Sequence, residues 1–286
     1  MSEFYYFMIA GYSEPFGYIH SSFITAMPWP SCWSLDHSKR FLTLLSPPSD
    51  YESRTYLMHT TLRTGHEKGD VDALRNNWAN ELFPVYTSTG EHVLDMDGCG
   101  VDLFGIVNYA VHMIAYVNTK EEGRKFWVPK RSKTKMTYPG MLDNTVGGSL
   151  RSGERPIDCI VREAGEEAAF PEEYTREKVR ACGTLSYQMD RTDDGREGCQ
   201  CQVQYLYEME VREDIVPEPF DGEVEVFRLM SLEEVVNALR RGEFKLNCGM
   251  TWMAYLVRHG IVNAENEGHL VEICARLNRK HDLFIV

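Results

Sequence analysis

The clearest periodic pattern in the chain lies between residues 155 and 169, where apolar side chains recur every three or four positions. At 3.6 residues per turn, such positions fall on one face of an α-helix. Pro156 suits the first turn, because its missing N–H would have no partner there in any case. We therefore expect a helix from about Arg155 to Ala169. Its apolar stripe consists of Ile157, Ile160, Val161, Ala164 and Ala168.

Patterns typical of strands lie on both sides of this helix. β-Branched and aromatic residues at 111–119 predict a strand, followed by a turn at 120–124 and a second strand over Lys125–Arg131. Residues 201–211 alternate clearly, and residues 224–230 predict another short strand. Two helices follow: one at 231–242, with Ser231 as N-cap and Glu234 completing a capping box, and one at 251–260. The order favours an α/β protein.

The first hundred residues predict a smaller, mixed α/β unit. Glycine and aspartate interrupt the pattern near Met96–Gly100, so we divide the chain into a leader domain, residues 1–100, and a main domain, residues 101–286. Within residues 73–86, a helix is expected that ends before Pro84. Aromatic residues are dense near the N-terminus, and they could form either an aromatic core or an apolar substrate pocket. They are Phe4, Tyr5, Tyr6, Phe7, Phe16, Tyr18 and Phe23.

Composition narrows the functional classes. The chain has 286 residues, 43% of them hydrophobic, and a net charge of −13, which argues against a nucleic-acid surface. No apolar run is long enough to span a membrane, and the N-terminus lacks the pattern of a secretory signal. Eight cysteines include no CxxC pair, and Cys199 and Cys201 are too close for a usual zinc ligand pair. We expect free thiols and a reducing, cytoplasmic setting.

Three carboxylates share a second face of the predicted helix. Glu163, Glu166 and Glu167 stand at i, i+3 and i+4, where like charges repel by a few tenths of a kcal/mol per pair, roughly. Stability gives no reason for this crowding. A hard divalent cation does, because Mg²⁺ prefers oxygen ligands and is commonly shared between carboxylates and substrate phosphates. The alternative is a solvated acidic helix face.

These glutamates belong to a longer pattern with fixed offsets, which includes Gly148, Glu154, Arg162 and Ala164. Gly148 lets the backbone approach a metal or phosphate closely, and Arg162 can reach Glu166 one turn on. The complete pattern resembles the signature of the Nudix hydrolases, which cleave diphosphate linkages with divalent metal. The usual glycine near its end is Ala169 here.

The resemblance extends over nearly the whole chain and is strongest from Phe126 to Phe170. Residues 126–148, 221–227 and 242–261 are similar to one branch of the family, which contains the Nudix domain of fungal thiamine pyrophosphokinase-type proteins and stand-alone fungal and plant proteins. It implies an α/β/α sandwich with a mixed sheet, preceded by the smaller leader domain. It also implies a metal-dependent diphosphatase acting on thiamine diphosphate or its oxidised derivatives, which yields the monophosphate and phosphate. A prenyl or terpenoid diphosphate in a fungal natural-product pathway is the alternative substrate.

The resemblance and the residue chemistry together give the candidate site. Glu163, Glu166 and Glu167 are expected to bind Mg²⁺, or Mn²⁺ in its place, with a backbone carbonyl near Gly148. One signature glutamate, or Glu223 or Glu225 from a neighbouring strand face, would orient the attacking water; a solvent-facing strand edge competes with that role. The candidates for substrate binding are Arg131, Lys133, Lys135 and Tyr138. The three cations could instead serve only surface solubility, and the tyrosine could instead serve only the packing of its turn.

Three classes of function remain open at this stage. The first is an active diphosphatase, with a small-molecule diphosphate as its partner. The second is a catalytically silent diphosphate-binding protein with the same fold. The third is an isomerase of the isopentenyl diphosphate type, which shares the fold but lacks the full signature, so the intact signature argues against it. A homodimer is an open alternative for the assembly.

Overall fold

The N-terminal part of the protein forms its own small sheet and core. The computed structural model describes residues 3–283, apart from 46–49, 69–70, 72–73, 75–77, 136, 192–197, 221 and 281–282. Four strands pair in the order β2-β1-β4-β3, and β5 and β6 form a separate ribbon. The strands are β1 (Phe4–Ile9), β2 (Gly17–His20), β3 (Trp33–Asp36), β4 (Phe41–Leu44), β5 (Leu82–Tyr86) and β6 (His92–Asp97). The helices are α1 (Ser21–Ala26), α2 (Tyr51–Lys68) and α4 (Gly98–Phe104).

Two expectations for this part can now be judged. Phe7, Phe16 and Phe23 are buried in the aromatic core, where Phe7 and Phe23 contact Phe104 and Phe16 contacts Phe7. Tyr6, in contrast, is 37% exposed. The helix expected in residues 73–86 is wrong from residue 78 onward, because residues 78–81 are not helical and Leu82–Tyr86 is a strand that contains Pro84. Residues 73 and 75–77 lie outside the described part. Proline is tolerated here because β5 pairs on one side only, with β6.

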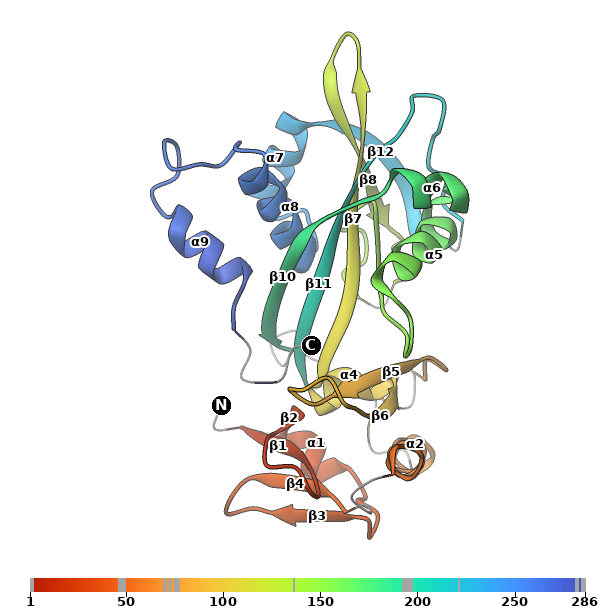
Figure 1. Cartoon of the computed structure of the whole chain (residues 1–286), viewed down its shortest axis with the longest axis vertical. Coiled ribbons are helices and arrows are strands. Elements are labelled where there is room, and N and C mark those ends of the chain that lie inside the picture. Colours follow the sequence, from red (N-terminus) through yellow and green to blue (C-terminus); the bar gives the residue numbers. More distant parts are fainter. Residues whose placement is uncertain are drawn as a thin grey trace.

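A large mixed sheet forms the main body of the protein (Figure 1). Its path is β10-β11-β7-β8-β12, and β9 pairs with β7. The pair β7–β11 is parallel, whereas β7–β8, β7–β9, β8–β12 and β10–β11 are antiparallel. The strands are β7 (Val107–Thr119), β8 (Gly123–Arg131), β9 (Val146–Ser149), β10 (Arg180–Asp190), β11 (Cys199–Glu210) and β12 (Val224–Ser231).

Helices cover both faces of this sheet (Figure 1). On one side α5 buries its stripe against the alternate side chains of β7, among them Val111 and Met113. On the other, α7 and α8 pack on Ile114 and Phe126. The helices are α5 (Pro156–Ala168), α6 (Glu172–Lys178), α7 (Leu232–Arg240), α8 (Leu246–Arg258) and α9 (Leu270–Leu277). The α/β/α sandwich with a mixed sheet is therefore confirmed.

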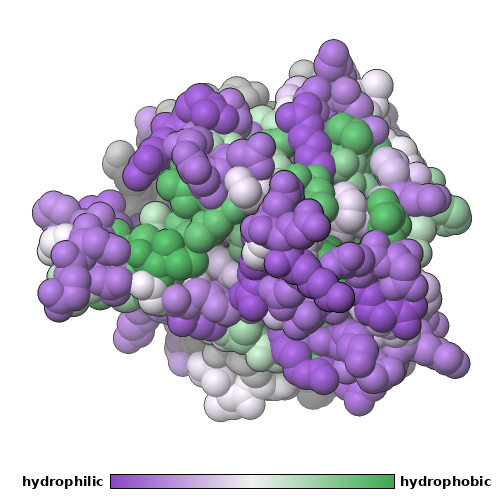
Figure 2. Space-filling model, turned by 90° about the horizontal axis from the view of Figure 1, so that it is seen from above, coloured by the Kyte–Doolittle hydropathy of each residue, from purple (hydrophilic) through white to green (hydrophobic). Residues whose placement is uncertain are grey.

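The two cores meet near residue 106. The N-terminal core runs from Phe7 to Ile106, and the core of the main sheet takes up Val107 as the first residue of β7. Helix α4 spans the point at which the sequence predicted a division, and the two-domain division at residue 100 stays a prediction. Within the described part of the chain, no helix combines the length and apolar character needed to cross a membrane. Viewed from above, polar residues cover most of the surface and hydrophobic ones form bounded patches between them (Figure 2).

Candidate metal and substrate site

Helix α5 forms where the apolar periodicity predicts it. Pro156 occupies its first turn, and Ala169 ends it in the left-handed conformation, with φ 55°. The Phe170 N–H then returns to the Ala164 carbonyl at 3.1 Å. Because Ile160, Val161 and Ala164 are buried against the sheet, the three glutamates are held on the part of the helix that faces β9 and solvent.

Strand β9 approaches this helix closely at its two glycines. A Cβ atom on Gly148 would lie 2.0 Å from Glu163 Oε1, and one on Gly147 would lie 2.7 Å from His112 Nδ1. The Gly147 N–H also donates to Glu167 Oε2 at 2.9 Å. The sequence therefore needs glycine at these positions because carboxylates and an imidazole occupy the space that a side chain would fill.

Arg162 ties the acidic groups together. Its guanidinium donates to both oxygens of Glu154, at 2.8 and 3.0 Å, and its Nη1 donates to Glu163 and Glu166 at 2.8 Å each. The reach to Glu166 is the contact that the i, i+4 spacing predicts. Burial opposes the ionisation of Glu154, but its hydrogen bonds from Arg162 and from the Arg151 N–H hold its pKa below the usual range.

Burial acts in the opposite sense on the two glutamates nearest β9. It raises the pKa of Glu163 to about 7, against the opposing effect of Arg162. Burial, and then the charge of Glu163, raise the pKa of Glu167 well above its usual value. Two carboxylates that are costly to ionise, placed side by side and next to the more exposed Glu166, form a set of oxygen ligands that a cation would stabilise.

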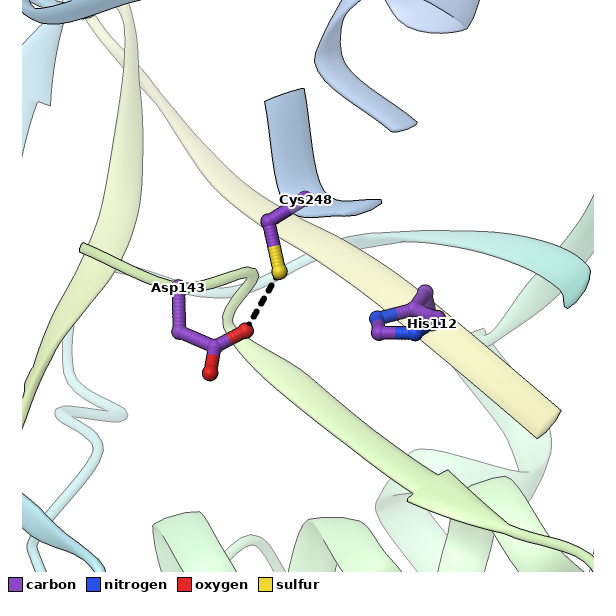
Figure 3. Close-up of side chains that lie close together, drawn as sticks. All are labelled: His112, Asp143 and Cys248. Atoms are coloured by element: carbon purple, nitrogen blue, oxygen red, sulfur yellow. Dashed lines mark hydrogen bonds between the residues drawn. The ribbon is translucent and has the colours of Figure 1, made fainter. Parts of the chain in front are cut away.

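A second group lies beside the first, where β7, the loop before β9 and the start of α8 meet (Figure 3). His112, Asp143 and Cys248 each offer one ligand atom, and these atoms lie within 4.8 Å of one another. The Cys248 thiol donates to Asp143 Oδ1 at 2.7 Å, and the Asn144 side chain contacts His112 Nδ1 at 2.9 Å. Burial raises the pKa of the Cys248 thiol and lowers that of His112 to about 3, so both are neutral at pH 7.

Asp143 is the charged member of this second group. Burial opposes its ionisation, but Lys245 and then Arg131 hold its pKa well below the usual range. The Arg131 Nη1 lies 2.6 Å from Asp143 Oδ2. Since two cations already balance the carboxylate, the group is stable without a metal ion, and we read it as a polar wall next to the glutamates. Asp143 is close enough to Glu167 to raise its pKa.

The other predicted residues lie around this wall. Lys135 pairs with Glu223 at 2.5 Å, and Lys130 pairs with Glu225 at 3.1 Å, while Lys133 is exposed. Glu223 and Glu225 do not alternate on one strand face as expected, because Glu223 precedes β12 and a bulge between Val224 and Val226 displaces Glu225. Arg131 is buried and also donates to the Thr137 carbonyl at 2.9 Å. The roles assigned to these residues from sequence stay predictions.

Sequence reasoning gave no role to His112, Asp143, Lys245 and Cys248. Three of them come from loops or helices distant in sequence, and the Cys248–Asp143 contact joins residues 105 positions apart. The sequence predicted the last helix only from residue 251, whereas α8 begins at Leu246, so the pattern did not place Lys245 and Cys248 at a helix start. All eight cysteines are free thiols, as the sequence predicts.

Comparisons with known proteins show which proteins this chain resembles. The model of the NUDIX domain matches residues 108–249. An uncharacterized protein of Saccharomyces cerevisiae is 34% identical over 87% of this chain and 74% of its own length. The chloroplastic Nudix hydrolase 24 of Arabidopsis thaliana is 32% identical over 89% of this chain and 68% of its own. The crystal structure of DR0079 from Deinococcus radiodurans covers 70% of this chain and all of its own, with 19% identity and a TM-score of 0.40.

Proposed function

Because the chain belongs to the Nudix hydrolase family, whose members hydrolyse diphosphate-type compounds with divalent metal, we propose that it hydrolyses a small organic diphosphate. The substrates we propose are thiamine diphosphate and its oxidised derivatives, with the monophosphate and phosphate as products. The observation that carries the proposal is the closely packed set of three glutamates, in which Arg162 binds Glu163 and Glu166 and the charge of Glu163 acts on Glu167.

The residues present fit a hard divalent cation such as Mg²⁺, or Mn²⁺ in its place. The donors are carboxylate oxygens, and the absence of a side chain at Gly148 lets the Glu163 carboxylate lie against the strand backbone. Glu163, Glu166 and Glu167 would hold the ion, together with a backbone carbonyl near Gly148. When bound there, the ion polarises the phosphoryl oxygens of the substrate and neutralises charge that develops during cleavage.

The protein's own groups hold the carboxylates in place for this chemistry. Arg162 fixes Glu163 and Glu166 from one side, and Glu154 fixes Arg162 through two hydrogen bonds. The Gly147 N–H orients Glu167 from the other side. Removal of such supporting contacts commonly lowers metal affinity or activity by about 10- to 100-fold.

The attacking water requires a carboxylate within hydrogen-bond reach. We propose a signature glutamate for this role or, at the rim, Glu223. Glu223 is near enough to Glu167 to raise its pKa, and its own partner is Lys135. Glu225 remains the further candidate, although it already pairs with Lys130.

Purified full-length protein with Mg²⁺ tests the proposal. Phosphate release would be measured from thiamine diphosphate, its oxidised forms, prenyl diphosphates, ADP-ribose and nucleoside diphosphates. We expect release from the thiamine compounds. Glu166→Gln should lower kcat by about 100-fold or more. The matched control is Glu173→Gln, since Glu173 is an exposed glutamate on the next helix.

Two outcomes would contradict the proposal. Equal activity of wild-type protein and Glu166→Gln would overturn the metal assignment. An absence of release from every substrate would favour a catalytically silent diphosphate-binding protein.

A further inference from the structure

A hollow of about 180 Å³ opens to solvent between the start of α8, the end of β10 and the start of β11. Its walls carry two phenol rings and three carboxamides, together with methionine and leucine side chains at the edge. The residues used here are Tyr138, Tyr187, Gln188, Gln200, Asn247 and Met250. A concave surface with this mixture of apolar and polar side chains is typical of sites that bind part of a small organic ligand.

Two sets of contacts place this hollow next to the polar wall of the proposed metal site. On one side, Asn247 lines the hollow, and the next residue, Cys248, donates to Asp143. On the other side, Arg131 pairs with Asp143 and also donates to the carbonyl of Thr137, the residue before Tyr138. One residue, Cys248, therefore separates the hollow from Asp143 on the first route, and two, Thr137 and Arg131, separate them on the second.

Lys245 stands between the two regions. It immediately precedes Leu246 and Asn247, both of which line the hollow, and its backbone N–H donates to the Leu142 carbonyl at 2.9 Å, next to Asp143. Its charge acts on Asp143 and His112 in the polar wall. A cation at this position suits a phosphate group that extends from the glutamates toward the hollow.

We propose that the hollow binds the organic group of the substrate, with the Tyr138 ring stacked on a planar, nitrogen-containing aromatic ring and Lys245 on the phosphate next to it. This inference rests on the diphosphatase function proposed above and assigns residues to the part of the substrate that is not cleaved.

The backbone of Tyr138 supports a role beyond turn packing. Its φ of 50° lies in the left-handed region, which costs a non-glycine residue of order 1 kcal/mol or more and is concentrated at ligand sites. Arg131 holds the preceding residue through the Thr137 carbonyl at 3.2 and 2.9 Å. The strained turn therefore presents the half-buried Tyr138 side chain to the hollow in a fixed orientation.

The opposite wall is fixed by buried hydrogen bonds. The Tyr187 hydroxyl donates to Gln202 Oε1 at 2.6 Å and to Gln200 Oε1 at 3.2 Å. Behind it, the Gln204 Nε2 donates to Gln202, and the Thr251 hydroxyl donates to Gln204. Such a network keeps the phenol ring and the Gln200 carboxamide in one arrangement before any ligand arrives.

The polarity of the lining selects between the two substrate classes left open by the sequence. A ring with amino groups and ring nitrogens can exchange hydrogen bonds with Gln188, Gln200 and Asn247. A prenyl chain would cover the same carboxamides without replacing their bonds to water, which is unfavourable. The hollow therefore favours a heteroaromatic diphosphate such as thiamine diphosphate over a prenyl diphosphate.

The test compares KM and kcat for thiamine diphosphate and for inorganic diphosphate, which has no ring. Tyr138→Leu should raise KM for thiamine diphosphate about tenfold, as loss of one ring contact predicts, and leave kcat within about twofold. Values for inorganic diphosphate should stay unchanged. Tyr56→Leu, at a tyrosine that is 68% exposed, is the matched control and should behave as wild type.

A second arm changes Lys245 and does not depend on turnover. Binding of thiamine monophosphate to the metal-free protein would be measured by calorimetry. We expect Lys245→Gln and Tyr138→Leu each to weaken it about tenfold, with Lys245→Arg recovering most of the loss. Lys120→Gln, at an exposed lysine of the turn between β7 and β8, should leave binding unchanged.

Several results would overturn the inference while leaving the diphosphatase function standing. One is hydrolysis of thiamine diphosphate with the same KM in wild type and Tyr138→Leu. Another is a kcat/KM for geranyl diphosphate that equals or exceeds the value for thiamine diphosphate. If no substrate is hydrolysed, the proposed diphosphatase function is wrong. If, in addition, Tyr138→Leu and Lys245→Gln leave the binding of thiamine monophosphate unchanged, the inference about the hollow is wrong as well.

Discussion

Glu163 shows at the scale of one residue how burial and function are linked. The side chain is 15% exposed, accepts a hydrogen bond from Arg162 and lies against the backbone of Gly148. Burial raises its pKa to about 7 in spite of the neighbouring guanidinium. A carboxylate in this condition binds either a proton or a cation near neutral pH, so metal binding and protonation compete.

This competition predicts the pH dependence of metal binding. As pH falls below about 7, Glu163 takes up a proton that Mg²⁺ must displace, so the apparent affinity should fall by about tenfold per pH unit. Calorimetric titration of Mg²⁺ between pH 5.5 and 8.5 measures this. Glu163→Gln should bind more weakly throughout and show a shallower slope. An affinity that is independent of pH below 7 would contradict the prediction.

The same shift has a consequence for stability in the absence of metal. A carboxyl group whose pKa is raised on folding stabilises the folded state below its unfolded pKa, and this stability is lost as pH rises through the folded value. The metal-free protein should therefore become less stable between about pH 4.5 and 7, and Mg²⁺ should restore stability at the upper end.

Helix α5 is the element that organises the site. Its apolar stripe is buried on β7 and β9, so the position of every glutamate on it is set by packing rather than by the metal. Its two ends differ in how well their residues suit the backbone conformation. Pro156 suits the first turn, but Ala169 ends the helix in a left-handed conformation that glycine adopts without steric cost.

The end of α5 therefore offers a stabilising substitution. Ala169→Gly should raise the free energy of unfolding by about 1 kcal/mol, because it removes the left-handed strain at φ 55°. Urea unfolding measures the change as a shift of the midpoint. Ala275→Gly, at an exposed position inside α9, is the matched control and should lower stability by about 1 kcal/mol. A decrease for Ala169→Gly would show that the cap tolerates alanine for another reason.

Across the whole molecule, the N-terminal part touches the loop that supports the site. Glu81 pairs with Arg151 at 2.5 Å, and the Ser152 N–H donates to the Leu82 carbonyl at 2.7 Å. The Arg151 N–H in turn donates to Glu154, which holds Arg162. Three successive contacts thus connect the N-terminal unit to the guanidinium that orients the carboxylates.

This chain of contacts predicts an effect at a distance. Both members of the Glu81–Arg151 pair are 40% exposed, so their loss should change stability by less than about 1 kcal/mol. We expect Glu81→Gln to lower kcat by about two- to fivefold, because the loop that carries Glu154 becomes less constrained. Glu52→Gln, at an exposed glutamate of α2, serves as the control. Steady-state kinetics and thermal unfolding separate the two effects, and an unchanged kcat would limit the contact to a structural role.

The sequence by itself determined helix α5, its buried stripe and the three glutamates. The reason is that these features depend on spacing within one helix, where positions three and four apart are always neighbours. The capping box at Ser231 and Glu234 was predictable in the same way, and the structure forms it. The family resemblance added the sandwich, which periodicity could not name.

Only the tertiary structure decided what surrounds those glutamates. The contacts of Asp143 with Cys248 and of Asn144 with His112 join segments 105 and 32 positions apart, and they exist because β7, β9 and α8 converge there. The bulge in β12 interrupts the alternation that the sequence predicted around Glu225. Residues 82–86, which the sequence pattern assigned to the end of a helix, form strand β5 because they pair with β6. Strand pairing and helix packing set such contacts, whereas spacing along the chain does not.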